Sequence, residues 1–463
     1  MAENTREIVL DTLLALERGE EFSHRLLKAV LDKYDYLDSR DKAFIKRVTE
    51  GTIERQLELD YYLDAYSSVP VRKMKPIIRC LLRMSVYQIL YMDAVPDSAI
   101  CNEACKLAEK RKFRNLKGFV NGVLRHIAKD KTSLPMPDEK KNPTEYISVK
   151  YSMPRWLVNM WLDEYGKKGT VTLLEGLLQI HPVSLRFKTT LSREEREAWV
   201  DKLQRAGAEL TQSPYLPYVY VGTNIEGIST LPGFAEGAFT VQDVSSALAV
   251  SVAGIKEGDF VMDICAAPGG KSILAAEKAA KVLSRDVSES KIAVIGENLE
   301  RMQVSNVTTQ VYDATVTDAH YTEQADVLIM DVPCSGLGVM GKKRDIKYHA
   351  SPENIESIVE LQRMIVQNSW QYVKPGGILL YSTCTINRAE NEDMVRWMAE
   401  QLPLEPVSIR DCLPEKILAA DRAIREQVQK PAGLPQELDD ACMQLLPGYM
   451  DADGFFFAKF RRK

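Results

Sequence analysis

The sequence DICAAPGGKS at residues 263–272 determines how the C-terminal half of the chain folds. Its first two residues are the end of a short apolar run, VMDI at 261–264, and a helical segment follows it. We therefore expect a turn between a buried strand and a helix. Small residues let the backbone of such a turn approach a ligand closely, and the start of the helix offers free N–H groups to a negative group. The turn has too few glycines for a phosphate loop or a complete dinucleotide-binding fingerprint. These residues therefore predict a small-ligand site in an α/β fold.

Two acidic residues end the next two predicted strands. Asp286 closes KVLSRD, fifteen residues after Lys271, and Asp313 closes TTQVYD. A carboxylate in the first position can accept hydrogen bonds from two ribose hydroxyls, and one in the second could reach an adenine amino group. Either acid alone is more often a solvated strand end. In series with the turn, the two acids indicate S-adenosylmethionine as the cofactor.

The alternation of strand, turn and helix continues toward the end of the chain. The runs VLIMDV at 327–332 and ILLYS at 378–382 have the length and the lack of alternation of buried parallel strands. The chain ends on another apolar run, GFFFAKF at 454–460. Residues 241–463 therefore predict a doubly wound, Rossmann-like α/β domain.

The N-terminal part has a different pattern. Residues 1–129 show apolar positions at helical spacing without the alternation of strands, so we expect only helices. A polar stretch with prolines at 129–145 has too little apolar surface to order itself and is expected to be a linker. From 146 to 240, alternating runs and a helix capped by Ser192 and Glu195 indicate a small α+β module.

The length of 463 residues is too great for one ordinary domain. We expect three: 1–145, helical with its linker; 146–240, a small RRM/ferredoxin-like module; and 241–463, the α/β domain. Hydrophobic residues (45%) and charged residues (27%) are typical of a folded globular chain, and no apolar run reaches the length of a membrane span. Eight dispersed cysteines predict reduced thiols in a cytosolic protein. The net charge of −5 excludes a uniformly basic nucleic-acid coat but allows a local basic patch.

Two cysteines follow two of the predicted strands. Cys334 lies in DVPCSG, after Asp331, and Cys384 lies in YSTCT. Because ligands of an open parallel sheet bind outside the carboxyl ends of its strands, we expect both thiols at the edge that carries the cofactor turn. A single cysteine is more often a small core residue than a nucleophile, but two at this edge favour chemistry.

Methylation of a pyrimidine supplies a reason for a thiol at this position. Carbon 5 of cytosine becomes nucleophilic only after a thiolate has added to carbon 6, which is covalent catalysis by a thiol of lowered pKa. The reaction also needs a group that supports N3 as charge develops there, and Asp331 is placed to do so. The second cysteine could assist release.

The motifs together resemble the Nop/Sun family of RNA cytosine-C5 methyltransferases. The resemblance rests on DICAAPGGKS (263–272), DVPCSGLG (331–338) and YSTCT (381–385). GFVNGVLR (118–125) is similar to the end of a NusB-like domain, and VQDVSS (241–246) is similar to the entry of the family's catalytic domain. The order of NusB-like helices, small module and methyltransferase resembles that of bacterial family members that modify small-subunit ribosomal RNA.

The resemblance implies roles for individual residues. Cys384 matches the nucleophile, Cys334 matches the cysteine that helps release the methylated RNA, and three acids line the cofactor and base pocket. These acids are Asp286, Asp313 and Asp331. The matching cofactor loop consists of Cys265, Ala266, Ala267, Pro268, Gly269, Gly270 and Lys271. The stretch KKRDIKYH (342–349) departs from the family form R-x-P-D-I-K-W, because Arg344 replaces its proline and Tyr348 its tryptophan.

A cluster of positive charge in residues 71–129 is a candidate RNA surface. It holds 13 Lys and Arg and 4 Asp and Glu, so its balance is 13 − 4 = +9 in a chain of −5. Such a field could attract phosphates, and a solvated helix face is an equally good interpretation. RNA binding through this surface predicts that charge reversal at Arg111, Lys112 and Arg114 weakens the complex.

The resemblance implies methyl transfer from S-adenosylmethionine to carbon 5 of a cytidine in 16S ribosomal RNA by a cytoplasmic enzyme. A transfer RNA is the alternative substrate, and a non-catalytic RNA-binding assembly or antitermination factor is the alternative from another class. We expect a monomer without a membrane partner or a metal. Cys101 and Cys105 lie four apart, but no suitably spaced Cys or His pair accompanies them.

Overall fold

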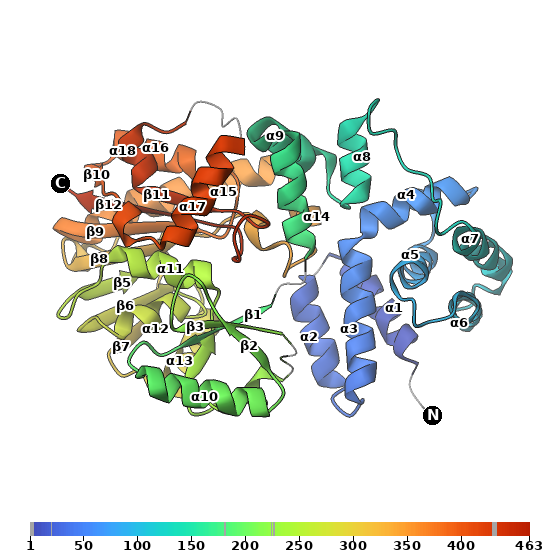
Figure 1. Cartoon of the computed structure of the whole chain (residues 1–463), viewed down its shortest axis with the longest axis horizontal. Helices are drawn as coiled ribbons and strands as arrows, with labels where there is room; N and C mark the ends of the chain where they lie inside the picture. Colours follow the sequence, from blue (N-terminus) through green and yellow to red (C-terminus); the bar gives the residue numbers. More distant parts are fainter. Residues whose placement is uncertain (1–3, 20, 180–181, 224, 226, 428–432) are drawn as a thin grey trace. The chain divides into compact units, whose positions relative to one another are not determined.

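The computed structural model describes residues 4–19, 21–179, 182–223, 225, 227–427 and 433–463. The chain divides into two compact units. The first contains residues 1–171 together with 342–349, and the second contains 172–341 and 350–463 (Figure 1). No helix in the described ranges is long and apolar enough to cross a bilayer.

The first unit is helical, as the sequence predicts for its first 129 residues. Its central helix, α5 (Pro76–Tyr91), is buried along most of its length and packs against α1, α3, α4, α6 and α7. A helix that is apolar on nearly all sides can form only where neighbours surround it. The other helices of this segment are α1 (Thr5–Leu16), α2 (Ser23–Lys33), α3 (Ser39–Glu54), α4 (Gln56–Tyr66), α6 (Asp97–Lys110) and α7 (Lys117–Lys129).

Two further helical elements follow in the chain. α8 (Pro143–Lys150) starts inside the polar stretch 129–145, so its last three residues are helical and not a linker as predicted. α9 (Arg155–Leu178) breaks at Gly166, whose φ of 63° is outside the helical region. A short helix from far along the sequence, α14 (Ile346–His349), belongs to the first compact unit. Nothing in the spacing of apolar residues predicted that placement.

The second unit begins with a small antiparallel sheet of order β2-β3-β1-β4. Its strands are β1 (Val183–Phe187), β2 (Glu209–Gln212), β3 (Val219–Thr223) and β4 (Phe239–Val241). Helix α10 (Arg193–Arg205) has the predicted capping box, in which the Ser192 side chain accepts from the backbone N–H of Glu195 and the Glu195 side chain accepts from that of Ser192. The mixture of helix and strands expected in this segment is present. The RRM/ferredoxin-like assignment and the three-domain division stay predictions.

The large sheet has the order β10-β12-β9-β8-β5-β6-β7, with β11 paired to β12. Five strands are parallel: β5 (Phe260–Asp263), β6 (Lys281–Asp286), β7 (Val307–Val311), β8 (Ala325–Asp331) and β9 (Val373–Thr383). The last strands, β10 (Leu404–Pro406), β11 (Cys442–Leu445) and β12 (Phe455–Arg462), pair antiparallel. The Rossmann-like prediction is confirmed, with a mixed rather than a purely parallel sheet.

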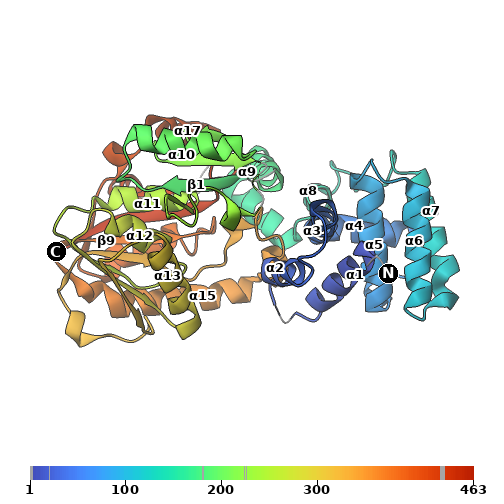
Figure 2. The same ribbon diagram turned by 90° about the horizontal axis from the view of Figure 1, so that it is seen from below.

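Helices cover both faces of this sheet (Figures 1 and 2). α15 (Pro352–Ser369) and α16 (Glu392–Gln401) contribute Ile365, Val366 and Met394 to the core on one face. The other face carries α11 (Val244–Ala253), α12 (Gly270–Ala276) and α13 (Glu289–Arg301). Burial on both faces explains why the central strands are continuous apolar runs.

Candidate active site

The carboxyl ends of the five parallel strands bring the predicted site residues together. Along β9, β8, β5, β6 and β7 these ends carry, in that order, Cys384, Asp331 with Cys334, the cofactor turn, Asp286 and Asp313. Asp263 pairs in register with Ile329 and Asp331 with Ser382, so the strands end at similar heights. One edge of the sheet therefore holds every residue to which the sequence assigned chemistry.

The cofactor turn needs a glycine at position 269. Gly269 has a φ of 100° and precedes α12, and a Cβ there would lie 3.3 Å from the side chain of Ile295. That backbone conformation and the close helix α13 both favour glycine. The turn is thereby pressed against α13, and Cys265 and Ala267 face the cavity beside it.

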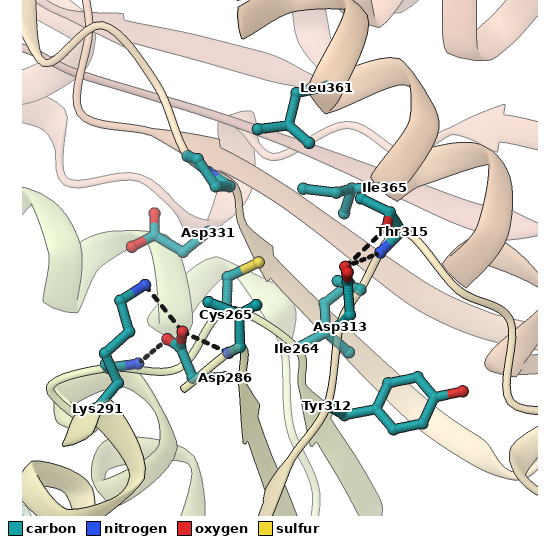
Figure 3. Close-up of a pocket in the computed structure, with 14 residues that line it drawn as sticks. Ile264, Cys265, Asp286, Lys291, Tyr312, Asp313, Thr315, Asp331, Leu361 and Ile365 are labelled. Carbon is teal, nitrogen blue, oxygen red and sulfur yellow. Dashed lines mark hydrogen bonds and ion pairs between the residues drawn. The ribbon is translucent and has the colours of Figure 1, made fainter. Parts of the chain in front are cut away.

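A cavity of about 300 Å³ lies at this edge, within the range of small-molecule sites (Figure 3). Its walls come from the ends of four strands and from α13 and α15. They are formed by Ile264, Cys265, Ala267, Asp286, Val287, Lys291, Tyr312, Asp313, Ala314, Thr315, Asp331, Pro333, Leu361 and Ile365. Three acids and several aliphatic side chains thus line the cavity, which fits a ligand with a sugar, a base and a charged end.

Asp286 is buried and ties the cofactor turn to β6. Its Oδ2 accepts a hydrogen bond from the backbone N–H of Ala267 at 2.9 Å. Its Oδ1 accepts from Val287 N and from the Lys291 ammonium, each at 2.8 Å. Lys291 was not singled out in the sequence; its position in the first turns of α13, five residues after Asp286, is the signal that could have found it.

Asp313 lies on the opposite side of the cavity and is exposed. Its Oδ1 accepts from the hydroxyl and the backbone N–H of Thr315, at 2.7 and 2.9 Å. These two hydrogen bonds lower the pKa of Asp313. The carboxylate is therefore ionised and fixed in direction, so it can accept a hydrogen bond from a ligand in the cavity (Figure 3).

Asp331 is held by two side chains. Its Oδ2 lies 2.6 Å from the Nζ of Lys271, and its Oδ1 accepts from the hydroxyl of Ser382 at 2.8 Å. Lys271 is buried, so the pair is shielded on the lysine side, while Asp331 remains partly exposed to the cavity. The last residue of the predicted cofactor loop thus orients the acid at the end of β8.

The two thiols are adjacent. The Sγ atoms of Cys334 and Cys384 lie 3.2 Å apart, and the backbone N–H of Cys384 donates to Cys334 Sγ at 3.3 Å. Both cysteines are half-buried. The interaction with Cys384 and burial raise the pKa of Cys334 well above its usual value. Cys334 therefore keeps its proton at neutral pH, and it can act as a hydrogen-bond donor.

Buried groups surround the turn. Burial raises the pKa of Asp263 to about 7, although the hydroxyl of Ser272 donates to it. Burial also raises the pKa of Cys265, so this thiol lines the cavity as a neutral group. Among the described residues, no cluster of three or more His, Cys, Asp or Glu side chains could hold a metal ion.

The positive cluster in 71–129 is partly neutralised in the fold. Ion pairs occupy seven of its 13 cations: Arg79, Arg83, Lys106, Lys110, Arg111, Arg114 and Lys117. Four of the acids come from outside the segment: Glu7, Asp11, Glu17 and Asp60. Counting them reduces the balance to 9 − 4 = +5. The value of +9 overstated the local charge, because a count along the sequence omits acids from neighbouring helices.

The stretch KKRDIKYH is anchored within the helical unit. Arg344 pairs with Glu50 and Glu54 at 2.6 and 2.8 Å. The buried ammonium of Lys347 donates to the carbonyls of Glu54 and Ser152 at 2.7 and 2.6 Å. Asp345 accepts from the backbone N–H of Ser23 at 2.6 Å. Arg344, the departure from the family form, therefore has acidic partners of its own.

The fold and the site define the class I methyltransferases, here joined to a NusB domain. The family described as 16S rRNA methyltransferase RsmB/F matches residues 250–461, and the NusB family matches residues 3–129. The chain is 31% identical over 475 residues to the probable ribosomal RNA small subunit methyltransferase B of Bacillus subtilis (strain 168), covering 99% of both chains. It is 30% identical to the ribosomal RNA small subunit methyltransferase B of Salmonella arizonae, covering 97% of this chain and 96% of that one. The chain belongs to the RsmB/F family of methyltransferases.

Solved structures share the fold. The crystal structure of PH0851 has a TM-score of 0.79 at 24% identity and covers 100% of both chains. NSun6 from Pyrococcus horikoshii, solved with SFG, has a TM-score of 0.53 at 20% identity and covers 67% of this chain and 98% of that one. The family matches and the curated relatives confirm the predicted family resemblance, the NusB-like helices and the methyltransferase domain.

Proposed function

We propose that the protein transfers a methyl group from S-adenosylmethionine to carbon 5 of a specific cytidine in 16S ribosomal RNA. Membership of the RsmB/F family supports an enzyme of ribosomal RNA methylation. The observation that carries the cytosine-C5 assignment is the pair of thiols, 3.2 Å apart, beside an acid that lines the cavity. Methyl transfer to an exocyclic nitrogen or a ribose hydroxyl would give these thiols no role.

Residues around the cavity match the parts of S-adenosylmethionine. Asp286 is placed to accept from the ribose hydroxyls and Asp313 from the adenine amino group, while Cys265 to Lys271 form the turn beside them. SFG, which the NSun6 structure contains, is an analogue of this cofactor. When bound, S-adenosylmethionine supplies an electrophilic methyl group on a sulfonium.

The covalent step uses Cys384. Its thiolate adds to carbon 6 of the cytosine, a carbon–sulfur bond forms, and the electron pair of the 5,6 double bond is delocalised toward N3. Carbon 5 then forms a bond to the methyl group, and the sulfonium keeps the electron pair as a thioether. A base removes the proton from carbon 5, and that electron pair re-forms the double bond as the carbon–sulfur bond breaks and returns the thiolate.

Asp331 and Cys334 support this sequence of bonds. Asp331, held by Lys271 and Ser382, is placed to protonate or hydrogen-bond N3 while negative charge develops on the ring. Cys334 keeps its proton because burial and the interaction with Cys384 raise its pKa. It can therefore donate to the departing sulfur of Cys384 and favour release of the product RNA.

The expected partners follow from the same proposal. The substrate is small-subunit ribosomal RNA, the protein acts in the cytoplasm as a monomer, and no metal takes part. Lys112 and Arg125 are exposed cations of the segment 71–129 that form no ion pair with other described residues, so they can meet phosphates. The helical unit is therefore the candidate RNA-binding part.

Bisulfite sequencing of ribosomal and transfer RNA from cells that lack the protein tests the proposal. We expect loss of one 5-methylcytidine in 16S ribosomal RNA, restored by the wild-type chain but not by Cys384→Ala. The purified Cys384→Ala protein should still bind S-adenosylmethionine, and Cys334→Ala should accumulate a covalent RNA adduct. Loss of a transfer RNA mark instead, or full activity of Cys384→Ala, would contradict it.

A further inference from the structure

A buried carboxylate that the proposed mechanism does not use lies directly behind the two thiols. Glu390 is fully buried and follows β9 in the loop before α16. Its carboxylate accepts hydrogen bonds from the residue that follows each cysteine in the chain, Ser335 after Cys334 and Thr385 after Cys384. One side chain thus connects the two loops that present the thiols.

Four donors converge on this carboxylate. Its Oε2 accepts from the backbone N–H of Ser335 at 2.8 Å and from the amide of Gln362 at 3.2 Å. Its Oε1 accepts from the hydroxyls of Ser335 and Thr385, the latter at 3.4 Å, and these two hydroxyls lie 2.8 Å from each other. The carboxylate is therefore fully engaged by the two cysteine loops and by α15.

A second layer fixes the position of Glu390 itself. The hydroxyl of Tyr381 donates to the backbone carbonyl of Glu390 at 2.7 Å and lies 3.2 Å from Gln362 Oε1. Gln362 also donates to the carbonyl of Pro333, the residue before Cys334, at 2.9 Å. Both Tyr381 and Gln362 are fully buried. A shift of Glu390 would therefore disturb at least one of the cysteine loops.

Burying a carboxylate is costly, so its presence needs a compensating role. Burial raises the pKa of Glu390, while the hydrogen bonds from Ser335, Gln362 and Thr385 oppose that rise. An apolar side chain of similar size would avoid the desolvation but could not hold the backbone N–H of Ser335 and the hydroxyl of Thr385 together. Glu390 therefore makes hydrogen bonds to the two loops that carry the thiols, which an apolar residue could not make.

We propose that Glu390 is a positioning residue, which fixes the separation of Cys334 and Cys384 by bonding the loops that follow them. The proposal rests on the proposed function, since Cys334 must reach the sulfur of Cys384 to release the product RNA. Glu390 touches neither the ring nor the cofactor. It acts through the backbone of Ser335 and the side chain of Thr385.

Three substitutions separate the positioning role of Glu390 from its charge. In Glu390→Gln, the amide oxygen can take the place of Oε2 and accept from Ser335 N and Gln362, while the amide nitrogen can donate to the hydroxyls of Ser335 and Thr385. All four contacts can therefore persist without the charge. In Glu390→Ala all four are lost. Thr385→Val removes both contacts of the Thr385 hydroxyl, to Glu390 and to the Ser335 hydroxyl, and keeps the side-chain volume.

The thiol separation can be measured without RNA. Diamide takes two hydrogens from the two thiols, is reduced to the hydrazine and leaves a Cys334–Cys384 disulfide, which mass spectrometry of peptides quantifies. The rate depends on how often the sulfurs come into bonding distance. We expect wild type and Glu390→Gln to form the disulfide at similar rates. Glu390→Ala and Thr385→Val should form it roughly tenfold more slowly.

Methylation is measured on the same full-length proteins. We expect Glu390→Ala to lower kcat about 100-fold with the Kd for S-adenosylmethionine unchanged, since small misplacements of reacting groups have effects of this size. Glu390→Gln should restore most of kcat. Glu58→Ala is the matched control, because Glu58 is a similarly buried carboxylate in the helical unit that accepts from Tyr91 and Tyr62. It should lower the unfolding temperature without changing the diamide rate.

The outcomes distinguish this inference from the proposed function. Wild-type closure in Glu390→Ala and Thr385→Val, or loss of kcat in Glu390→Gln equal to that in Glu390→Ala, would overturn the positioning role. A wild-type protein that closes its disulfide in a Glu390-dependent way but leaves no 5-methylcytidine would overturn the cytosine-C5 assignment alone. If Glu390→Ala does not fold, Thr385→Val carries the test by the same two measurements.

Discussion

The edge of the large sheet and the positive segment 71–129 were both predicted from residue types along the chain, with different outcomes. At the sheet edge, Cys384, Cys334 and Asp331 come together as predicted. In the positive segment, acids from outside reduce the charge balance from +9 to +5. The carboxyl ends of parallel strands always meet at the same edge of the sheet. The net charge around a surface cation, in contrast, depends on the acids of the helices that pack beside it. Motifs at strand ends are therefore safer evidence of function than charge counts.

The strongest test of the sheet edge is Asp331→Asn. Removing the acid should lower kcat by about 10²–10⁴-fold, because an amide cannot protonate N3 and no longer pairs with Lys271. Single-turnover transfer of a labelled methyl group to ribosomal RNA measures it. Asp411→Asn, at an exposed position, is the control. A kcat within a factor of a few of wild type would show that sharing an edge does not imply sharing a reaction.

The second test concerns a residue whose location the sequence did not reveal. Lys347→Met should destabilise the helical unit by roughly 2–4 kcal/mol, since the carbonyls of Glu54 and Ser152 would lose their donor. Chemical denaturation followed by hydrogen exchange in α3 measures the change. Lys343→Met, at an exposed position in the same stretch, should have little effect. Equal stability of the two variants would mean that this stretch does not anchor to the helices.

The same variant gives a pH dependence of known sign. Burial lowers the pKa of Lys347 to about 7, below the ordinary lysine value. Between pH 7 and the ordinary lysine pKa, the unfolded chain binds the proton more tightly, so this group makes stability rise with pH. Relative to wild type, Lys347→Met should lack that rise. The difference between the two unfolding curves from about pH 6 to 9 measures it, and parallel curves would contradict the assignment.

Asp286→Asn tests the same sheet edge with a smaller expected effect, on cofactor binding. The Kd for S-adenosylmethionine should rise about tenfold, because charged hydrogen bonds to the ribose and the pair with Lys291 would weaken. Calorimetric titration measures the Kd. Glu289→Gln, an exposed acid in the first turn of α13, should leave it unchanged. If both variants bind alike, the ribose role of Asp286 is wrong.

The smallest effect is expected in the positive segment. Lys112→Ala should weaken RNA binding a few-fold and reduce the salt slope by about 1, since this exposed cation forms no ion pair with other described residues and is available to a phosphate. Arg111→Ala should change affinity less, because Glu7 and Asp11 already occupy its guanidinium. Filter binding at several salt concentrations compares them. A larger effect at Arg111 would restore the simple charge count as a guide to the RNA surface.

Residues that act together with their near neighbours in the chain could be predicted from the sequence. The turn at 263–272, the acids at strand ends, the cysteines one residue beyond β9 and three beyond β8, and the capped helix α10 all follow from short-range patterns. Parallel strands converge on one edge by geometry, so the sequence is sufficient to assemble the main residues of the site.

The remaining features depend on how distant segments pack. The tertiary fold places residues 342–349 among the helices, joins Lys271 to Asp331, pairs Arg111 with acids about a hundred residues away, and sets Glu390 behind both thiols. None of these contacts has a local signal, because a buried polar group is satisfied by whatever donor or acceptor the packing of distant segments brings within reach.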